Sequence, residues 1–457
     1  MEPVEDFRKA GTDILLEPAF PYGEDLLQFI WEAGLYNPNE LRTTDHEPLE
    51  VLHAGRIQPN GGPDLSDAQV RIGGQLWAGN VEVHLRTSEW NAHGHQHDPA
   101  YNNVVLHAVY QHDAEVCTQN GRRPPTIELR QRIHEPNLLL HQALMMEHRT
   151  VPCANHLHDV DPARIRLWLE RLLVERLERK AREVEALYRS LGNDPAETLH
   201  HILLRSLGGP VNSDAFGMLA HALPLRVLLK YRDDAVRVEA LLLGQAGFLE
   251  DVFTEEYPLL LQQEHRWLAK LHGLRPVPAA AWKLGRLRPP NFPTVRLAQW
   301  ASAVASLDHG YDQLLAQEDP VVLAGLLQVE ASEYWRDHYR PGHRAEAKPK
   351  RLGRDMAEGL IINGIVPYLF AMGRIRGDPS WEERAITLME RLPAERNTVI
   401  REWSGLGIAA TSAGQGQALL ELRSRYCAER KCLNCAIGVQ LHKQLGQTHR
   451  FVDHCEK

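Results

Sequence analysis

The segment between residues 79 and 110 places titratable side chains between two apolar, strand-like runs. It reads GNVEVHLRTSEWNAHGHQHDPAYNNVVLHAVY and contains Glu82, His84, His93 and His95. Carboxylates and imidazoles are the side chains that bind divalent ions and transfer protons near neutral pH. The residue types and their spacing therefore predict a metal-dependent or acid–base site in this segment.

The first half of the site lies on a predicted β-hairpin. In VRIGGQLWAGNVEVHL, two alternating runs are joined by a Gly-Gly pair, which favours a tight two-residue turn. Such a turn pairs Val70 with Trp77. Because successive strand residues point to opposite faces, Glu82 and His84 then share the face opposite to the neighbouring valines.

Asp64, in the stretch NGGPD, is the second candidate carboxylate. Ideal pairing would set Asp64 opposite Val83, on the apolar face, so it joins Glu82 and His84 only through a bulge near 65–67 or irregular pairing. Two carboxylates and an imidazole would then suit Mg²⁺ or Mn²⁺, which can activate water for phosphodiester cleavage. The alternative interpretation is a solvated face, with Asp64 capping a turn.

The histidine-rich stretch that follows is predicted to be a loop between strands. The H-x-H spacing of His93 and His95 would put both rings on one side of an extended chain, as chelation requires. A surface loop with incidental histidines explains the same residues, and both interpretations stay open. We expect His97 to lie on the surface and His107, within an apolar run, to be a hydrogen-bonded core residue.

The C-terminal cysteines have the spacing of a metal site, C-x₄-C-x₂-C. Zinc in a structural site takes four ligands, and plant-type iron–sulfur clusters also use this spacing with a distant fourth cysteine. Three reduced, partly buried thiols are the alternative. The three spaced ligands are Cys427, Cys432 and Cys435, and the candidates for the fourth are Cys455, His454 and Cys153.

A polar, basic segment covers residues 336–354 and is predicted to be a loop. Its cations are candidates for contacts with the phosphates of a nucleic acid, although a solvated basic loop is the alternative. The residues proposed for these contacts are Lys348, Lys350, Arg351 and Arg354.

The sequence GGPD, a hairpin and then VEVH resembles the core of PD-(D/E)XK nucleases, in which an Asp, a second acid and a Lys surround a divalent metal. The resemblance implies that Asp64 and Glu82 are the acids, that His84 occupies the Lys position, and that Glu32 matches a helical acid of some members. A neutral imidazole is not a permanent cation, so water activation would differ. Some related nucleases join their ends through a cysteine cluster, which draws attention to Cys153.

A second resemblance covers most of the chain. The blocks GGPDLSDAQVRIGGQLWAGNVEVHLRTSEW, YNNVVLHAVYQHD, RPPNFPTVRLAQWA, INGIVPYLFAMG and YCAERKCLNCAIG are similar to successive blocks of one bacterial family of unknown function. This resemblance supports a common architecture and implies no particular activity.

Three regions with different sequence patterns must position these residues. The first begins with a helix carrying Leu26, Leu27, Ile30 and Trp31 on one face, followed by short β-branched runs. The second starts at Asp161-Pro162 and has helical periodicity. We predict an α/β (α+β) nuclease-like module with a restriction-endonuclease-like mixed sheet over 1–155, a mainly α-helical domain over 156–425, and a Cys-rich metal knuckle over 426–457.

Composition limits the classes of protein. The 457 residues are 43% hydrophobic and 24% charged, which is typical of a folded globular protein of two or three domains. The net charge of −9 argues against a protein that coats nucleic acid. We find neither an apolar run of ~18 residues nor a signal peptide in MEPVEDFRKAGTD. We therefore expect a cytoplasmic protein without a membrane segment, and six cysteines in a long chain argue against a disulfide scaffold.

Three functions are consistent with these patterns. The first is a divalent-metal-dependent nuclease or phosphodiesterase in which Asp64 and Glu82 hold Mg²⁺ or Mn²⁺, His84 orients or deprotonates water, and His93 or His95 assists. The second is a non-catalytic nucleic-acid- or protein-binding scaffold with a nuclease-like fold. The third is another metal-dependent hydrolase that uses the histidine-rich loop.

Overall fold

The computed structural model describes residues 22–58, 61–285, 287–307 and 310–455, with side chains up to residue 445. The N-terminal stretch searched for a signal peptide and the Asn60 of NGGPD lie outside these residues. The chain divides into two compact units, one formed by 1–165 together with 426–457 and the other by 166–425. The cysteine-rich end is thus grouped with the N-terminal residues. Each unit is described by itself below.

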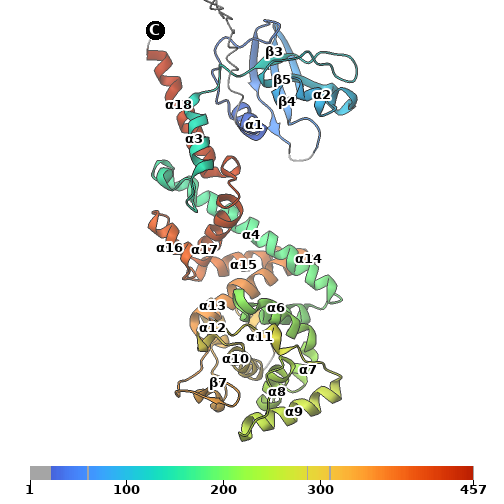
Figure 1. Cartoon of the computed structure of the whole chain (residues 1–457), viewed down its shortest axis with the longest axis vertical. Helices are drawn as coiled ribbons and strands as arrows, with labels where there is room; N and C mark the ends of the chain where they lie inside the picture. Colours follow the sequence, from blue (N-terminus) through green and yellow to red (C-terminus); the bar gives the residue numbers. More distant parts are fainter. Residues whose placement is uncertain (1–21, 59–60, 286, 308–309, 456–457) are drawn as a thin grey trace, which may run out of the picture. The chain divides into compact units, whose positions relative to one another are not determined.

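Unit 1 contains a curled mixed sheet with the strand order β1-β3-β4-β5-β6, and β2 also pairs with β3 (Figure 1). The pairs β1–β3 and β3–β4 are antiparallel, whereas β4–β5 and β5–β6 are parallel. The mixed α/β character predicted for this region is therefore confirmed. The strands are β1 (Leu49–His53), β2 (Arg56–Ile57), β3 (Leu65–Ile72), β4 (Gln75–Arg86), β5 (Val104–Gln111) and β6 (Thr126–Glu128).

The predicted hairpin is β3–β4, and Val70 pairs with Trp77 as expected. Gly73 and Gly74 form its turn with φ of 56° and 89°, a left-handed conformation that glycine adopts at little cost. Because β5 runs parallel to β4, the chain between them must cross over the sheet. The histidine-rich stretch predicted as a loop consists of the short helical turns of this crossover: α2 (Glu89–Ala92), η1 (His95–His97) and η2 (Pro99–Asn103).

Helix α1 (Glu24–Ala33) covers the apolar face of the sheet and contacts β4. Its apolar residues recur at the helical period, so one face of α1 is buried against the sheet valines Val81 and Val83. The helix ends at Gly34, whose left-handed φ of 64° lets its backbone N–H cap the last turn. The burial of Leu26, Leu27, Ile30 and Trp31 confirms the predicted face.

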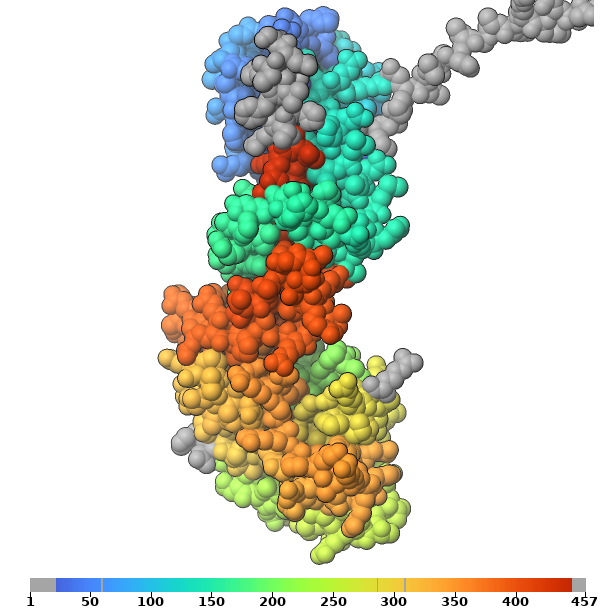
Figure 2. All heavy atoms as spheres, turned by 90° about the vertical axis from the view of Figure 1, so that its left-hand side faces the viewer, coloured from blue at the N-terminus to red at the C-terminus, as the bar shows by residue number. Residues whose placement is uncertain are grey.

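The rest of unit 1 is a helical layer made from distant parts of the sequence. Helix α3 (Glu135–Met146) and the turn η3 (Ala154–Asp159) pack against α18 (Ala436–Cys455). Figure 2 shows the red surface of α18 against the turquoise surface of this earlier segment. In the interior, Nδ1 of His442 lies 3.3 Å from Oδ1 of Asn137. The C-terminal residues are therefore part of the core of unit 1.

Unit 2 is helical, as the periodicity predicts. Helix α4 (Pro162–Ser190) leads into it, and the Asp161 carboxylate caps that helix by accepting the Ala163 N–H at 2.9 Å. The following helices are α5 (Pro195–Leu207), α6 (Gly209–Ala222), α7 (Leu225–Lys230), α8 (Ala235–Gln245), α9 (Glu256–His272), α10 (Pro293–Ser306), α11 (Tyr311–Ala316), α12 (Pro320–Leu327), α13 (Arg354–Leu360), α14 (Val366–Arg376), α15 (Pro379–Arg391), α16 (Thr398–Gly405) and α17 (Ala413–Glu421).

Among the described residues of unit 2, the helical stretch 354–376 is long and apolar enough to cross a membrane. It joins α13, the π-helical turn η7 (Ile361–Ile365) and α14, and 83% of its most apolar window is buried inside the protein. This burial is the pattern of a core helix. The basic segment 336–354, predicted to be a loop, contains a small antiparallel hairpin. Its strands are β7 (His338–Arg340) and β8 (His343–Arg344).

Candidate metal centre

A β-bulge brings Asp64 onto the same face as Glu82. Ala68 pairs with Gly79, but Leu65 pairs with Val81, so one extra residue is accommodated between them. The backbone N–H of Asp64 donates to Oε2 of Glu82 at 3.0 Å. In return, the N–H of Val83 donates to Oδ2 of Asp64 at 2.9 Å. The bulge that the sequence required for this convergence is therefore present.

The bulge depends on Asp67, which adopts a left-handed φ of 61°. This conformation is unfavourable for residues with a Cβ, and most of all for β-branched ones. We expect Asp67→Val to lower the free energy of unfolding by roughly 1–2 kcal/mol and to weaken metal binding, because the register that holds Asp64 is lost. Asp67→Gly should preserve both properties. Urea unfolding and Mn²⁺ titration of the two variants test this, and equal behaviour of both would contradict the role of the bulge.

Two histidines contact the Glu82 carboxylate, and a third histidine contacts one of them. Nε2 of His84 lies 3.1 Å from Nδ1 of His93 and 3.5 Å from Oε1 of Glu82. Nε2 of His95 lies 3.1 Å from that same Oε1. His84, His93 and His95 each offer one ring nitrogen, and these three atoms lie within 4.8 Å of one another. The arrangement thus joins the predicted residues into one cluster of metal-binding atoms.

The reason that His93 and His95 approach each other differs from the one expected. On an extended chain the H-x-H spacing would place both rings on one side, but His93 follows α2 and His95 begins η1. Gly94 between them has a left-handed φ of 79°, which turns the chain back toward the sheet. Their ring centroids are 5.5 Å apart. His97 is exposed, as predicted.

The cluster is mostly buried, which excludes the interpretation of Glu82 and His84 as a solvated face. Glu82 is 3% exposed and His84 is 1% exposed, whereas His93 is exposed. His107 is fully buried opposite Glu82 in the β4–β5 pair, and its Nε2 lies 2.9 Å from Nδ1 of His84. The core position expected for His107 is confirmed. Tyr101 stacks on His95 with a centroid distance of 3.8 Å and covers the cluster from the side of the crossover.

Helix α1 adds two residues that the sequence analysis missed, Glu24 and Gln28. Gln28 hydrogen-bonds the Asp64 carboxylate, and Glu24 lies in the electrostatic field of Asp64 and Glu82. Glu32, the helical acid selected from the resemblance, instead accepts the Ile57 N–H at 3.2 Å. Eight residues of helix separate Glu32 from Glu24 by about 12 Å, so both cannot face one site. The only available sequence signal was the i, i+4 spacing of Glu24 and Gln28.

Burial and like charges shift the pKa values of the cluster. Burial, followed by the negative charge of Glu89, raises the pKa of Glu24 to about 7. Burial and the nearby Glu82 carboxylate raise the pKa of Asp64 above its usual range. Burial, followed by His107, lowers the pKa of His84 to about 2. Crowded carboxylates that resist ionisation are the electrostatic condition that a bound cation relieves.

The cysteines form a second cluster in unit 1. Cys427, Cys432, Cys435 and Cys153 are all buried and line one small cavity of about 20 Å³. Burial raises the pKa of the Cys153 thiol to about 12 and that of Cys432 to about 11. The other candidates for a fourth ligand are His454 and Cys455, whose side chains are not among those that the structure describes. They belong to the far end of α18, which extends roughly 28 Å beyond Cys435.

The basic residues selected for phosphate contacts lie in unit 2. Lys350 is 4% exposed, and its ammonium donates to the carbonyls of Arg336 and Lys348 at 2.8 and 2.9 Å. The other three side chains are exposed, and each has a partner within unit 2: Lys348 pairs with Glu346, Arg354 with Glu358, and Arg351 donates to the Gln328 carbonyl.

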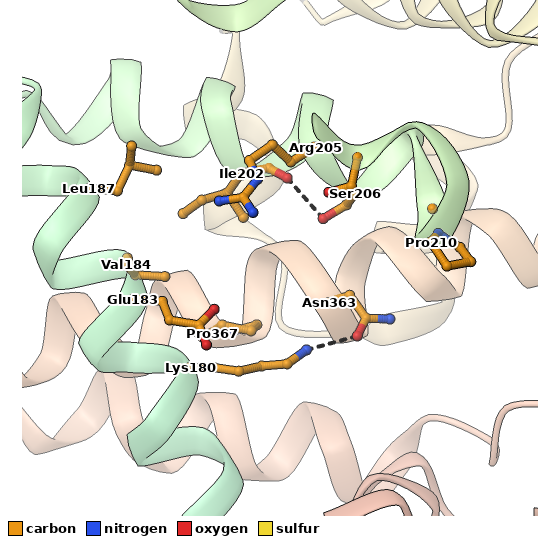
Figure 3. Close-up of a pocket in the computed structure, with 12 residues that line it drawn as sticks. Lys180, Glu183, Val184, Leu187, Ile202, Arg205, Ser206, Pro210, Asn363 and Pro367 are labelled. Carbon is orange, nitrogen blue, oxygen red and sulfur yellow. Dashed lines mark hydrogen bonds between the residues drawn. The ribbon is translucent and has the colours of Figure 1, made fainter. Parts of the chain in front are cut away.

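Unit 2 also contains a cavity of about 370 Å³ that the sequence analysis did not identify (Figure 3). Lys180 and Glu183 reach it from α4, Arg205 from α5, and Asn363 from the π-helical turn η7. Nζ of Lys180 donates to Oδ1 of Asn363 at 2.9 Å, and burial lowers the pKa of Lys180 to about 8. These residues are far apart in the sequence, so only packing reveals the cavity.

Comparison with known proteins identifies the family. A family described as "Protein of unknown function (DUF2851)" matches residues 24–398, which include the whole histidine–carboxylate cluster. A search of the curated proteins and a search of the solved structures each found no match. The matched segment covers most of the chain and agrees with the resemblance to a family of unknown function. The chain therefore belongs to the DUF2851 family.

Proposed function

We propose that this protein is a divalent-metal-dependent nuclease or related phosphodiesterase with its active site at the histidine–carboxylate cluster of unit 1. The observation that carries the proposal is the convergence of Asp64 and Glu82 with His84, His93 and His95. The resemblance to the PD-(D/E)XK core implies acids in these positions. The antiparallel β3–β4 hairpin followed by parallel β5 and β6 supports a restriction-endonuclease-like sheet.

The distances fit a metal ion. Metal–nitrogen bonds of 2.0–2.1 Å in a tetrahedral site separate neighbouring ligand atoms by about 3.4 Å. The contacts among His84, His93, His95 and Glu82 are 3.1–3.5 Å. Moreover, Nε2 of His95 is buried and has no hydrogen-bond partner among the described residues, although it lies close to Glu82. We take the contact distance and the missing hydrogen bond together as the geometry of two ligands of one ion.

The donor set suggests which ions bind best. Imidazole ligands favour Zn²⁺ and similar transition metals, and carboxylates suit Mn²⁺ and Mg²⁺; of the latter two, Mn²⁺ accepts nitrogen ligands more readily. We therefore propose Mn²⁺ or Zn²⁺ ahead of Mg²⁺, with Glu82 and Asp64 as the anionic donors. When bound, such an ion lowers the pKa of a water molecule and stabilises charge on a phosphoryl oxygen.

The protein's own residues have distinct roles in this proposal. His107 fixes the ring of His84 through the 2.9 Å contact between their nitrogens. Burial lowers the pKa of His84 to about 2, so its imidazole stays neutral near pH 7 and does not take up a second proton. The exposed His93 contacts His84 and supplies the third ring nitrogen of the cluster. Glu24, with a pKa of about 7, is the candidate proton acceptor.

Nucleic acid is the proposed partner. Lys348, Arg351 and Arg354 are exposed and remain candidates for phosphate contacts, whereas the buried Lys350 already uses its ammonium within unit 2. The small number of cysteines in this long chain supports a cytoplasmic location. If these cations contact phosphates, the affinity for nucleic acid should fall as the salt concentration rises. Variants that remove the exposed cations should show a weaker dependence of affinity on salt.

A second candidate function is a metal-dependent hydrolase of another class that acts on small esters or amides. The three imidazoles around Glu82 favour it, because histidine-rich sites are typical of zinc hydrolases. A third, the non-catalytic scaffold, is favoured by the burial of Glu82 and His84. The three candidates make different predictions about turnover.

The test is a cleavage screen of the full chain on single- and double-stranded DNA and RNA with Mn²⁺, Zn²⁺ or Mg²⁺. Small phosphodiesters, esters and amides are included, and Asp64→Ala is assayed beside the wild type. We expect cleavage of phosphodiesters with Mn²⁺ and its loss in Asp64→Ala. Cleavage of esters or amides alone would favour the second candidate, and binding without cleavage would favour the scaffold. Cleavage that survives Asp64→Ala would show that the site lies elsewhere.

A further inference from the structure

The cavity lined by four cysteines in unit 1 has the ligand set and the size of a structural metal site. Cys427, Cys432 and Cys435 come from one short segment, whereas Cys153 comes from the turn that precedes η3 (Ala154–Asp159). All four are 6–8% exposed. The cavity of about 20 Å³ is near the minimum that holds one water-sized sphere, so its size favours a single ion.

The backbone around the cysteines is organised to present them. Cys432 and Cys435 flank the turn η9 (Cys432–Asn434), and α18 begins at the next residue. Arg430, two residues before this turn, adopts a left-handed φ of 55°. Its side chain donates to the carbonyls of Glu147 and Arg149, which lie on the chain leading to Cys153. The knuckle is therefore held against the Cys153 segment by contacts other than the thiols.

Close packing fixes the position of the knuckle. A Cβ added at Gly438, in the first turn of α18, would lie 2.2 Å from the carbonyl oxygen of Cys432. Real Cβ atoms do not come this close to backbone, so only glycine allows α18 to pack directly on the turn. The cavity between the thiols thus belongs to a closely packed structure with four potential ligands and room for one ion.

We propose that Cys153, Cys427, Cys432 and Cys435 hold one structural Zn²⁺, which fastens the C-terminal segment to the N-terminal residues of unit 1. Four thiolates form a closed tetrahedral zinc site with no open position for substrate. The ion is distinct from the one proposed for the histidine–carboxylate cluster. Its role is to join two segments that are distant in the sequence, so that the free energy of metal binding stabilises the folded unit.

The test compares the zinc content of full-length wild type, Cys153→Ser, and Cys117→Ser as a matched control. Cys117 is an exposed cysteine outside the cavity. We expect Cys153→Ser to lose about one equivalent of zinc and Cys117→Ser to lose none. We also expect protease cleavage near residues 426–435 to be at least about tenfold faster in Cys153→Ser, because the segment is released. Equal zinc content in the two variants would overturn the proposal.

A second measurement separates this ion from the other proposed site and does not depend on a variant. Co²⁺ bound by thiolates gives intense thiolate-to-metal charge-transfer absorption, which histidine and carboxylate ligands do not produce. We expect this absorption in Co²⁺-loaded wild type and in His95→Ala, whose replaced ligand belongs to the other cluster. Its absence from both would overturn the proposal even if Cys153→Ser fails to fold. Iron and inorganic sulfide in anaerobically purified wild type would overturn the choice of zinc.

Discussion

Replacing Glu82 by glutamine is expected to reduce metal-dependent cleavage by more than about 100-fold while unit 1 stays folded. Loss of an outer-shell partner of a metal ligand typically costs 10–100-fold, and Glu82 is proposed as a direct ligand. One oxygen of Glu82 accepts the Asp64 N–H and the other contacts His95. Glutamine keeps an oxygen for the Asp64 N–H but removes the negative charge, so the variant separates metal binding from folding.

The matched control is Glu50→Gln in the same sheet. Glu50 is exposed and pairs with Arg71 on the neighbouring strand, away from the cluster. Surface ion pairs contribute little to stability, so this variant should keep wild-type cleavage and wild-type Mn²⁺ affinity. Calorimetric titration of Mn²⁺ and circular dichroism complete the comparison. A folded Glu82→Gln protein that cleaves at the wild-type rate would refute the assignment of Glu82 as a ligand.

Acidification is expected to destabilise unit 2 through its buried histidines, of which His200 has the clearest environment. His200 is fully buried, with Nδ1 2.9 Å from the Tyr311 hydroxyl and Nε2 3.2 Å from the Leu223 carbonyl oxygen. Burial lowers its pKa to about 4, against the attraction of Glu197, whereas the unfolded value is near 6.5. The unfolded chain therefore binds this proton first, so stability is full above pH 6.5 and falls as the pH drops toward 4.

The size of this effect follows from the difference in pKa between the two states. A difference of about 2.5 units corresponds to roughly 3 kcal/mol of unfolding free energy lost between pH 6.5 and pH 4. Between pH 6.5 and pH 4, the unfolding free energy of His200→Gln should therefore fall by about 3 kcal/mol less than that of the wild type. This difference is expected even if the variant is less stable than the wild type at pH 7. His343→Gln, at an exposed position, should follow the wild type. Hydrogen–deuterium exchange of α5 peptides across this pH range measures the change, and parallel curves for His200→Gln and wild type would contradict it.

Local sequence signals predicted the elements of the site well because they depend on residues close together in the chain. The alternation around Gly73-Gly74 predicted the β3–β4 hairpin, and Asp161-Pro162 predicted the start of α4. The same signals indicated that Asp64 required a bulge, which Asp67 provides. Turn, strand and cap preferences reflect backbone geometry over a few residues, so they can be predicted from a single sequence.

Tertiary structure decided three other features of the protein. These are the nearness of Glu24 to the site, the approach of His93 to His95 within the crossover, and the position of Cys153 beside the C-terminal cysteines. Nothing in the local pattern around Glu24 or Glu32 distinguishes them, because both lie on the same helix, eight residues apart, and only the docking of α1 on the sheet selects one. The sequence by itself determined which side chains were available and which short elements carry them. The packing of those elements, driven by burial of apolar faces, determined which side chains meet.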